Sequence, residues 1–191
     1  MTVCIFASSS SKIDGEFRDA AHHLGSLFAR NGYEVIFGGG GIGLMKSVAD
    51  AIIENEGRIT GVIPSFMIEA GWDHRGVTDM IVTSDMGERK KQMFARANAV
   101  VALPGGIGTL EELTEAITLK QLGLFRGPIV ILNTQGFYNS LIGFLDQMIR
   151  SNFLRLEHKG IWQVADTPEE VIKAISIDQD WMPDPRSIAK I

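Results

Sequence analysis

Two compact clusters of glycine are the first feature of this sequence that could serve chemistry. One cluster is Gly38–Gly41, with Gly43 just after it, and the other lies within the segment PGGIGTLEE at 104–112. Glycine lets a backbone approach another group closely because it carries no side chain. Scattered glycines would indicate ordinary turns, whereas clusters indicate places where the backbone must come close to something. We therefore expect both segments to border a bound group.

The second cluster has the composition of a phosphate-binding loop. It runs from Gly105 through Gly106, Ile107 and Gly108 to Thr109, between an apolar run and a helical pattern. The first turn of a helix has unpaired N–H groups and the positive end of the helix dipole. Glycines there remove side chains that would block an anion, and the threonine adds a hydroxyl donor. The loop is predicted to cradle a phosphate; the alternative is a plain strand-to-helix turn, which rarely needs three glycines.

The first cluster matches the spacing of a dinucleotide-binding fingerprint only formally. Residues 38–43 satisfy Gly-x-Gly-x-x-Gly, but a run of glycines satisfies many patterns. The strand that follows ends at Ile63-Pro64 without the carboxylate that would hold a ribose. Leu44 follows the last glycine, so the Gly-Lys-Ser/Thr ending of a P-loop is missing. We interpret this segment as a loop of close backbone approach to a nucleotide, not as an NAD or ATP site.

Glu112 and Arg89 are the charged residues whose positions could serve a reaction. Glu112 follows Thr109 by three residues, which is the spacing of a capping box, so its carboxylate could serve either a substrate or a backbone N–H group. Arg89 falls at helical spacing with Met86, on or beside an apolar helix face. Its guanidinium could point into the site, snorkel to solvent, or pair with Asp85 one turn earlier. Residue spacing leaves these alternatives open.

Strands and helices alternate along the chain, and this order must position both loops. The strands read as short apolar runs, and the helices show apolar residues at spacings of three and four. Strands are expected at 2–7, 33–37, 59–63, 80–83, 99–103, 128–132 and 161–164. Helices are expected at 14–29, 44–55, 85–98, 109–122 and 137–150, with a last helix that begins at the capping motif 167–170. Residues 65–78 show no clean period and are expected to form a surface loop.

Continuous apolar strands separated by helices are typical of a parallel sheet that is buried on both faces. We therefore predict an α/β fold, namely a Rossmann-like, doubly wound and mostly parallel sheet with helices on both faces. The chain is expected to be one nucleotide-binding domain over 1–191, with a C-terminal tail at 181–191. Ligands in such sheets bind at the carboxyl ends of the strands. Both glycine clusters begin where a strand ends, so both are expected at that edge.

The composition excludes several classes of protein. The chain has 191 residues, of which 45% are hydrophobic and 21% charged, and this balance excludes wholesale disorder. The net charge of −5 argues against a binder of nucleic acid, because phosphate-rich partners need a basic face. The single cysteine, Cys4, excludes an intramolecular disulfide, and the four histidines lack the spacing of metal ligands, so no metal site is expected. The sequence shows no membrane span and no signal peptide, and a cytoplasmic location is expected.

Four segments together resemble the Lonely Guy family of cytokinin-activating phosphoribohydrolases. PGGIGTLEE fits the family's hallmark PGGxGTxxE. VCIFASSS, GGGGIGLMKSVADA and MGERKKQMFARANAVVALPGG resemble the family's first strand and loop, its second motif, and its catalytic helix with the following strand. The likeness extends over residues 2–175. It implies a Rossmann-type homodimer that hydrolyses the N-glycosidic bond of nucleoside 5′-monophosphates, such as AMP or a cytokinin riboside 5′-monophosphate, to free base and ribose 5-phosphate.

The resemblance also implies roles for individual residues, without a metal or an organic cofactor. Arg89 and Glu112 occupy the positions of the family's catalytic pair, which favours catalysis over capping for Glu112. The nucleotide pocket is implied to be lined by these two and by Ser9, Gly40, Gly41, Met45, Lys90, Gly105, Gly106, Ile107, Gly108 and Thr109. The chain departs from the family at Ala7-Ser8, where relatives commonly have Cys-Gly, and at Gly87, which replaces a frequent histidine. Both departures could alter the preference for base or substrate.

These residues suit the cleavage of a ribosyl–base bond. Bond breaking builds positive charge on the sugar, and a carboxylate beside the ribose can either stabilise that charge or activate water. A cation can hold the phosphate or assist departure of the base, and the glycine loop positions the reacting carbon through the 5′-phosphate. Two alternatives from other classes remain: a non-catalytic nucleotide or molybdenum-cofactor carrier on the same fold, and a phosphate-sensing partner protein. Many relatives carry a lysine decarboxylase label, but nothing in the sequence indicates a lysine that holds pyridoxal phosphate.

Overall fold

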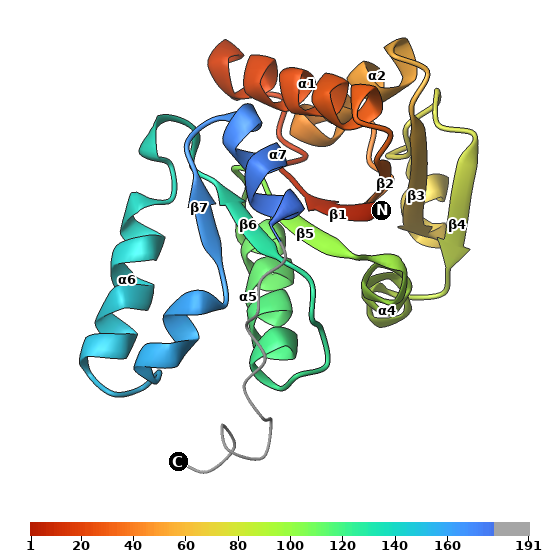
Figure 1. The fold of residues 1–191 in the computed structure, drawn as a ribbon. Coiled ribbons are helices and arrows are strands. Elements are labelled where there is room, and N and C mark those ends of the chain that lie inside the picture. The colour runs from red at the N-terminus through yellow and green to blue at the C-terminus, as the bar shows by residue number, and fades with distance from the viewer. Residues whose placement is uncertain (178–191) are drawn as a thin grey trace.

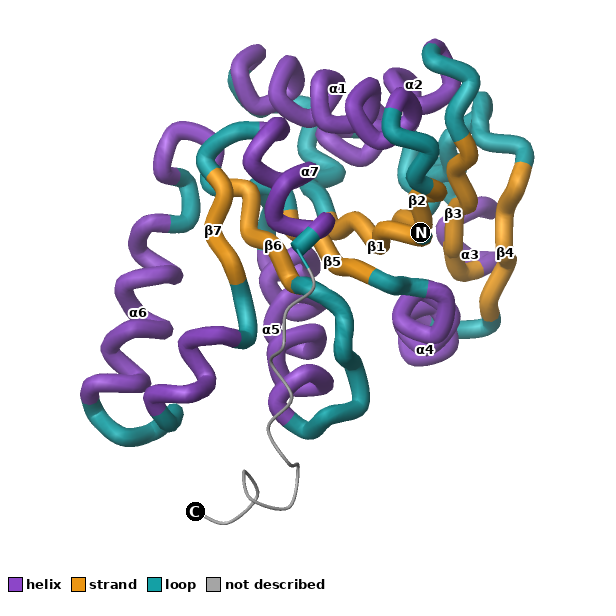
Figure 2. Tube along the Cα trace, in the orientation of Figure 1, coloured by secondary structure: helices purple, strands orange, loops and turns teal. Residues whose placement is uncertain are grey.

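A sheet of seven parallel strands organises the molecule (Figure 1; Figure 2). The computed structural model describes residues 1–177, and the tail expected at 181–191 lies outside the described residues. The strand order is β4-β3-β2-β1-β5-β6-β7, and every neighbouring pair is parallel. The prediction of a Rossmann-like, doubly wound α/β fold is thereby confirmed.

The elements follow the expected order within a few residues. The strands are β1 (Thr2–Phe6), β2 (Glu34–Phe37), β3 (Arg58–Pro64), β4 (Asp79–Thr83), β5 (Ala99–Ala102), β6 (Ile129–Leu132) and β7 (Gln163–Ala165). The helices are α1 (Gly15–Arg30), α2 (Gly43–Glu54), α3 (Ser65–Glu69), α4 (Met86–Arg96), α5 (Ile107–Gln121), α6 (Asn139–Arg150) and α7 (Pro168–Ser176), with short 3-10 helices at Thr134–Gly136 and Leu156–Gly160. Across residues 1–177, none of the helices combines the length and the apolar character that a membrane crossing needs.

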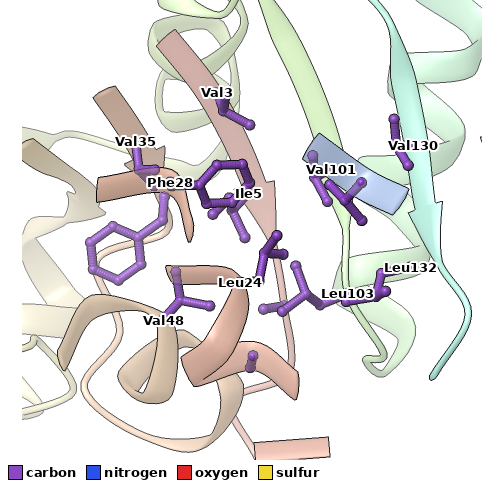
Figure 3. Packing of buried hydrophobic residues seen from close by; sticks show 14 of the residues in the cluster. Val3, Ile5, Leu24, Phe28, Val35, Val48, Val101, Leu103, Val130 and Leu132 are labelled. Atoms are coloured by element: carbon purple, nitrogen blue, oxygen red, sulfur yellow. The ribbon is translucent and has the colours of Figure 1, made fainter. Parts of the chain in front are cut away.

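Alternation along each strand divides the buried side chains between two cores. In β1, Val3 and Ile5 belong to the core on one face of the sheet, whereas Cys4 and Phe6 belong to the core on the other. Helices α1, α2 and α7 cover the first face, and α4, α5 and α6 cover the second (Figure 1). Figure 3 shows the first core, in which Leu24 of α1 belongs to the same cluster as Ile5 of β1 and Val101 of β5. Because both faces are covered, the strand sequence is a continuous apolar run.

The segment 65–78 was expected to be a surface loop, and this expectation is wrong for its first five residues, which form α3, and for His74, which is buried. The segment begins with α3 and then folds back against the first glycine cluster. The N–H of His74 donates to the carbonyl of Gly39 (2.9 Å), and the N–H of Gly41 donates to the carbonyl of Trp72 (2.8 Å). His74 is buried. These bonds join distant parts of the chain, so they leave no periodic trace in the local sequence.

The strand order reverses between β1 and β5, and this reversal creates the crevice at which a ligand can bind. The chain moves outward from β1 to β4 and then returns to place β5 on the other side of β1. The loops that leave β1 and β5 therefore diverge at their carboxyl ends, which opens the crevice. The two glycine clusters follow β2 and β5 at this edge of the sheet, as predicted.

Candidate active site

A cavity of about 600 Å³ lies at this crevice, within the size range of small-molecule sites. The loops after β1, β2, β3 and β5 form its walls, together with the first turns of α2, α4 and α5. Ten of the predicted site residues line it: Ser9, Gly40, Gly41, Met45, Arg89, Gly106, Ile107, Gly108, Thr109 and Glu112. Two others, Lys90 and Gly105, lie outside the lining. The parallel sheet thus brings most of the predicted residues to one place.

Arg89 and Glu112 form a buried ion pair in the wall of the cavity. Nη1 of Arg89 donates to Oε1 of Glu112 at 2.9 Å, and the two side chains are 8% and 10% exposed. Arg89 also donates from Nε to the carbonyl of Val62 (3.0 Å) and from Nη2 to the carbonyl of Gly38 (3.3 Å). Asp85 is engaged elsewhere, as the N-cap of α4. Solvent snorkelling and the Asp85 pair are therefore both wrong for Arg89, whose guanidinium points into the site.

Glu112 does not belong to a capping box. Helix α5 begins at Ile107 with Gly106 as its N-cap, so Thr109 is the third helical residue and does not cap. The capping alternative for Glu112 is therefore wrong. Burial raises the pKa of Glu112, and the opposing charge of Arg89 does not cancel this effect, so the pKa lies above that of an exposed glutamate. A carboxyl group with a raised pKa in a cavity is suited to proton transfer.

The N-terminus of α5 presents backbone donors to the cavity. Its N-cap, Gly106, offers no side chain, and the first helical bond runs from the N–H of Leu110 to the carbonyl of Gly106 (3.0 Å). The N–H groups of Ile107, Gly108 and Thr109 have no acceptor within residues 1–177, as is usual for a first helical turn. Together with the positive end of the helix dipole, these donors can bind an anion.

Gly106 and Gly108 are not required by packing within the protein. A Cβ atom built at either position meets no atom within 4 Å, although both residues line the cavity. Neither residue has a positive φ that would favour glycine. A plain strand-to-helix turn would accept alanine at both positions. The two glycines therefore favour a ligand that approaches the loop from the cavity.

The first glycine cluster, in contrast, is required by contacts within the protein. A Cβ at Gly38 would overlap Nη2 of Arg89. Gly43 has a φ of +69°, and a Cβ there would lie 2.6 Å from the carbonyl oxygen of Ser8. The same carbonyl accepts a hydrogen bond from the N–H of Leu44 (2.9 Å), so the N-terminus of α2 is occupied by the protein itself. Close approach of this loop to a nucleotide stays a prediction.

Lys90 and Gly105 do not line the cavity, but each contacts a residue that does. The Nζ atom of Lys90 bonds to Glu111 and, at 2.7 Å, to Glu115, and these hydrogen bonds raise the pKa of Lys90. A Cβ at Gly105 would overlap the hydroxyl of Thr109, so glycine leaves room for that side chain. The contact of Lys90 and Gly105 with a nucleotide, implied by the resemblance, stays a prediction.

The cavity also has an apolar part that residue spacing did not predict. Ile42, Ile63, Met67, Trp72 and Met86 line it. Ile42 follows β2, Ile63 lies near the end of β3, and the other three follow β3 or begin α4. All five are therefore distant in sequence from the phosphate-binding loop. The only local signal was a tryptophan within a segment that lacks a clean period, and one such residue does not specify a site.

The histidines lie apart from the cavity lining. His22 and His23 are on the exposed side of α1, where they contact Glu54 (2.9 Å) and Glu169 (2.6 Å). His74 is buried against α2. In the part of the chain that the structure describes, no group of three or more His, Cys, Asp or Glu side chains is arranged to hold a metal ion.

Comparison with known sequences finds relatives along nearly the whole chain. A family model described as "Possible lysine decarboxylase" matches residues 45–175. The cytokinin riboside 5′-monophosphate phosphoribohydrolase LOG4 of Arabidopsis thaliana is 35% identical over 187 residues, which cover 98% of this chain and 86% of the relative. The probable phosphoribohydrolase LOGL3 of Oryza sativa subsp. japonica is 38% identical over 169 residues, which cover 88% of this chain and 80% of the relative.

Comparison with solved structures finds the same fold in proteins of lower identity. The molybdenum cofactor carrier protein of Chlamydomonas reinhardtii superposes with a TM-score of 0.71, covers 92% of this chain and 95% of its own, and is 23% identical. The molybdenum cofactor binding protein of Rippkaea orientalis superposes with a TM-score of 0.65 over 92% of this chain and 96% of its own, at 24% identity. At these identities the likeness concerns the fold alone.

Proposed function

The chain belongs to the Lonely Guy family of phosphoribohydrolases, and we propose that it hydrolyses the N-glycosidic bond of a nucleoside 5′-monophosphate such as AMP or a cytokinin riboside 5′-monophosphate. The products of this reaction are the free base and ribose 5-phosphate. The observation that carries the proposal is the buried Arg89–Glu112 pair, which lies in the cavity wall one helical turn beyond Thr109.

The N-terminus of α5 holds the 5′-phosphate in this proposal. The N–H groups of Ile107, Gly108 and Thr109 bind the phosphate oxygens, with the helix dipole behind them. Gly106 and Gly108 leave the space in front of the loop open. Because Glu112 follows on the same helix, a phosphate fixed here places the ribose beside its carboxylate.

Glu112 acts on the water and on the charge of the sugar. The bond between C1′ and the base nitrogen breaks with its electron pair on the base, and positive charge develops on the ribose. The carboxylate stabilises this charge and accepts a proton from the water whose oxygen bonds to C1′. Glu112 then returns this proton to the departing base, which leaves as the neutral base, while the sugar carries the new hydroxyl at C1′ as ribose 5-phosphate. The raised pKa of Glu112 suits it to accept and return a proton.

Arg89 positions Glu112 in this reaction. Its three donors are directed at Glu112, the carbonyl of Val62 and the carbonyl of Gly38. These bonds fix the guanidinium between α5, β3 and the first glycine loop. The fixed guanidinium in turn holds the carboxylate at one place, and its positive charge opposes the rise that burial causes in the pKa of Glu112.

Release of adenine from AMP tests the proposal directly. Purified protein is incubated with AMP, and adenine and ribose 5-phosphate are measured by chromatography. Glu112→Gln keeps the size of the side chain and an acceptor for Arg89 but removes the charge, so turnover should fall by about 10²–10⁴-fold. The loss of the counter-charge in a buried site should also lower stability by about 1–3 kcal/mol, while AMP binding by calorimetry persists through the phosphate loop.

Glu170→Gln is the matched control for this experiment. Glu170 lies in the first turn of α7, where its carboxylate accepts a hydrogen bond from the N–H of Asp166 (2.7 Å), and it does not line the cavity. The turnover of AMP by Glu170→Gln should equal that of the parent protein. Near-normal turnover of Glu112→Gln would overturn the role of Glu112. Tight binding of AMP by the parent without any release of adenine would favour a nucleotide carrier instead.

We also propose that the chain forms a homodimer, as the resemblance implies. Exposed apolar side chains at both ends of α5 and just after it support this: Ile107 is 82%, Leu122 50% and Leu124 73% exposed. Exposed apolar side chains are one kind of surface that a second copy of the chain can cover. Light scattering that shows only a monomer of 20.9 kDa at working concentration would contradict the dimer.

A further inference from the structure

Trp72 is a large aromatic side chain that the structure leaves 52% exposed beside the cavity, whose wall it helps to form. We propose that Trp72 stacks on the base of the bound nucleotide and thereby selects purine over pyrimidine nucleotides. This inference rests on the proposed function, because it takes the nucleotide to lie in this cavity. Every base has an aromatic face on which an indole ring can stack, and a purine offers the larger face.

A series of hydrogen bonds links the Arg89–Glu112 pair to Trp72 through the first glycine cluster. Glu112 on α5 bonds to Arg89 on α4, and Arg89 bonds to the carbonyl of Gly38. The same glycine loop continues to Gly41, whose N–H donates to the carbonyl of Trp72 at 2.8 Å. With the phosphate at the start of α5 and the ribose at the ion pair, the base is left for the glycine loop and the tryptophan.

The backbone that carries Trp72 is held on both sides. The N–H of Trp72 donates to the carbonyl of Met67 in α3 (3.0 Å). Asp73 forms an antiparallel bridge with Gly40, and the N–H of His74 donates to Gly39 (2.9 Å). A ring on a fixed backbone loses little freedom when a base stacks on it, so more of the stacking appears as affinity.

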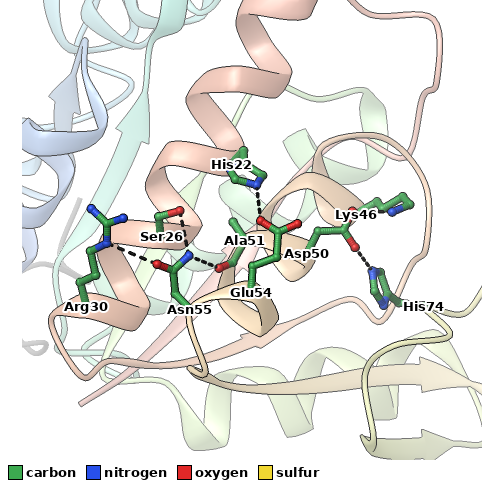
Figure 4. A network of polar contacts seen from close by, with 9 residues as sticks. All are labelled: His22, Ser26, Arg30, Lys46, Asp50, Ala51, Glu54, Asn55 and His74. Atoms are coloured by element: carbon green, nitrogen blue, oxygen red, sulfur yellow. Dashed lines mark hydrogen bonds and ion pairs between the residues drawn. The ribbon is translucent and has the colours of Figure 1, made fainter.

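His74 anchors this segment to α2 through its buried ring (Figure 4). Nε2 of His74 contacts Oδ1 of Asp50 at 3.0 Å, and Nδ1 accepts a hydrogen bond from the N–H of Gly76 at 3.1 Å. Because Nδ1 accepts a hydrogen bond, the ring proton is on Nε2, which donates a hydrogen bond to Oδ1 of Asp50. Asp50 also accepts a hydrogen bond from Lys46 on the same helix. The tryptophan segment is thus tied to α2 as well as to the glycine loop.

The side chains around Trp72 favour recognition of a base by its face. Met45, Ile63 and Met67 line the same part of the cavity and offer apolar or thioether surface. Contacts of this kind scale with the area of the ring that they cover. A purine gains more from them than a pyrimidine, whereas ribose 5-phosphate gains nothing.

Binding of three ligands to Trp72 variants tests the inference without relying on turnover. AMP, CMP and ribose 5-phosphate are titrated into the parent protein, Trp72→Ala and Trp72→Phe by calorimetry. Trp72→Ala should weaken AMP binding by roughly 5- to 150-fold, the range of one stacked base, and CMP binding by less. Its affinity for ribose 5-phosphate should be unchanged, and Trp72→Phe should recover part of the loss. Phe153→Ala, at an 82% exposed aromatic outside the cavity lining, is the matched control and should change none of the three.

Tryptophan fluorescence provides a second readout. AMP should quench the signal of the parent protein, and the quenching should be absent in Trp72→Phe, which keeps the other tryptophans. Equal losses for AMP and ribose 5-phosphate, or AMP quenching that persists in Trp72→Phe, would overturn the stacking role. Failure of the proposed function is separate: a parent protein that binds AMP with the Trp72 dependence described, but releases no adenine, contradicts hydrolysis and leaves the stacking inference standing.

Discussion

Replacing Gly38 by alanine tests whether the position of Arg89 controls the rate. Gly38 directly follows β2, and its carbonyl accepts a hydrogen bond from Nη2 of Arg89 at 3.3 Å. An added Cβ would overlap Nη2, would lie 3.1 Å from Cζ of the same guanidinium, and would lie 3.3 Å from the sulfur of Met45. Arginine is flexible, but this one is buried and bonded at three places, so it has little room to yield.

The expected effect can be worked out from this geometry. Ordinary contact between a carbon and a nitrogen needs a separation of about 3.5 Å, so Nη2 must retreat by roughly 1 Å or more. The guanidinium carries Glu112 with it, and a misplacement of about 1 Å in a reacting group can lower the rate by about 10²-fold, or about 2.7 kcal/mol. The bond to the Gly38 carbonyl is also weakened, which should cost about 1 kcal/mol of stability and lower the Tm by about 2–4 °C.

The assay is the rate of adenine release from AMP, measured beside the Tm and the affinity for inorganic phosphate. We expect Gly38→Ala to lower kcat strongly while phosphate affinity stays near that of the parent, because the phosphate loop is on α5. Gly143→Ala is the control, since a Cβ at this exposed position in α6 meets no atom within 4 Å. This control should keep its full rate and gain slightly in stability.

A double variant separates an effect through Arg89 from any other. In an Arg89→Ala background the methyl group of alanine at position 38 has room, so it should cause no further loss of activity or stability. Near-parental turnover of Gly38→Ala alone would refute the reasoning. If the loss of activity in the double variant equals the product of the two single losses, the alanine at position 38 acts by a route other than the guanidinium of Arg89.

Two further outcomes are expected. Gly106→Ala and Gly108→Ala should fold as stably as the parent, because a Cβ there meets nothing, yet bind AMP and inorganic phosphate at least about 10-fold more weakly in calorimetry; unchanged affinity would return the loop to a plain turn. Burial, assisted by the charge of Arg155, lowers the pKa of His158, whose Nδ1 accepts a hydrogen bond from the N–H of Arg155 (3.2 Å). As the pH falls, the imidazole of His158 is protonated more readily in the unfolded chain than in the folded protein, so the stability present above about pH 6.5 should be lost as the pH decreases. His158→Asn keeps an acceptor for the N–H of Arg155 and should flatten the acid side of a Tm–pH curve. Equal acid sensitivity of the parent and the variant would contradict this prediction.

The sequence by itself determined the order and type of most elements and one half of the candidate site. Apolar runs and helical periods depend on residues close in the chain, and the alternation of the two is enough to predict a doubly wound sheet. The phosphate loop is also local, since strand, glycines and helix follow one another over 104–112. Thr167 is a further local case: its hydroxyl accepts from the N–H of Glu170 at 3.3 Å, as the capping motif predicted, although the Glu170 carboxylate reaches Asp166 instead.

Only the tertiary structure decided what the charged residues and the first glycine cluster do. Glu112 and Arg89 are 23 positions apart, and spacing allowed a capping role for one and a solvent-facing role for the other. The glycines at 38–43 were predicted to form a loop close to a ligand, yet position 38 requires glycine because a Cβ there would overlap the guanidinium of Arg89. The apolar end of the cavity, with Trp72, was not predicted at all. The physical reason is the same in each case: these contacts join distant segments, so they exist only after the strand order has brought the carboxyl ends of β1, β2, β3 and β5 together.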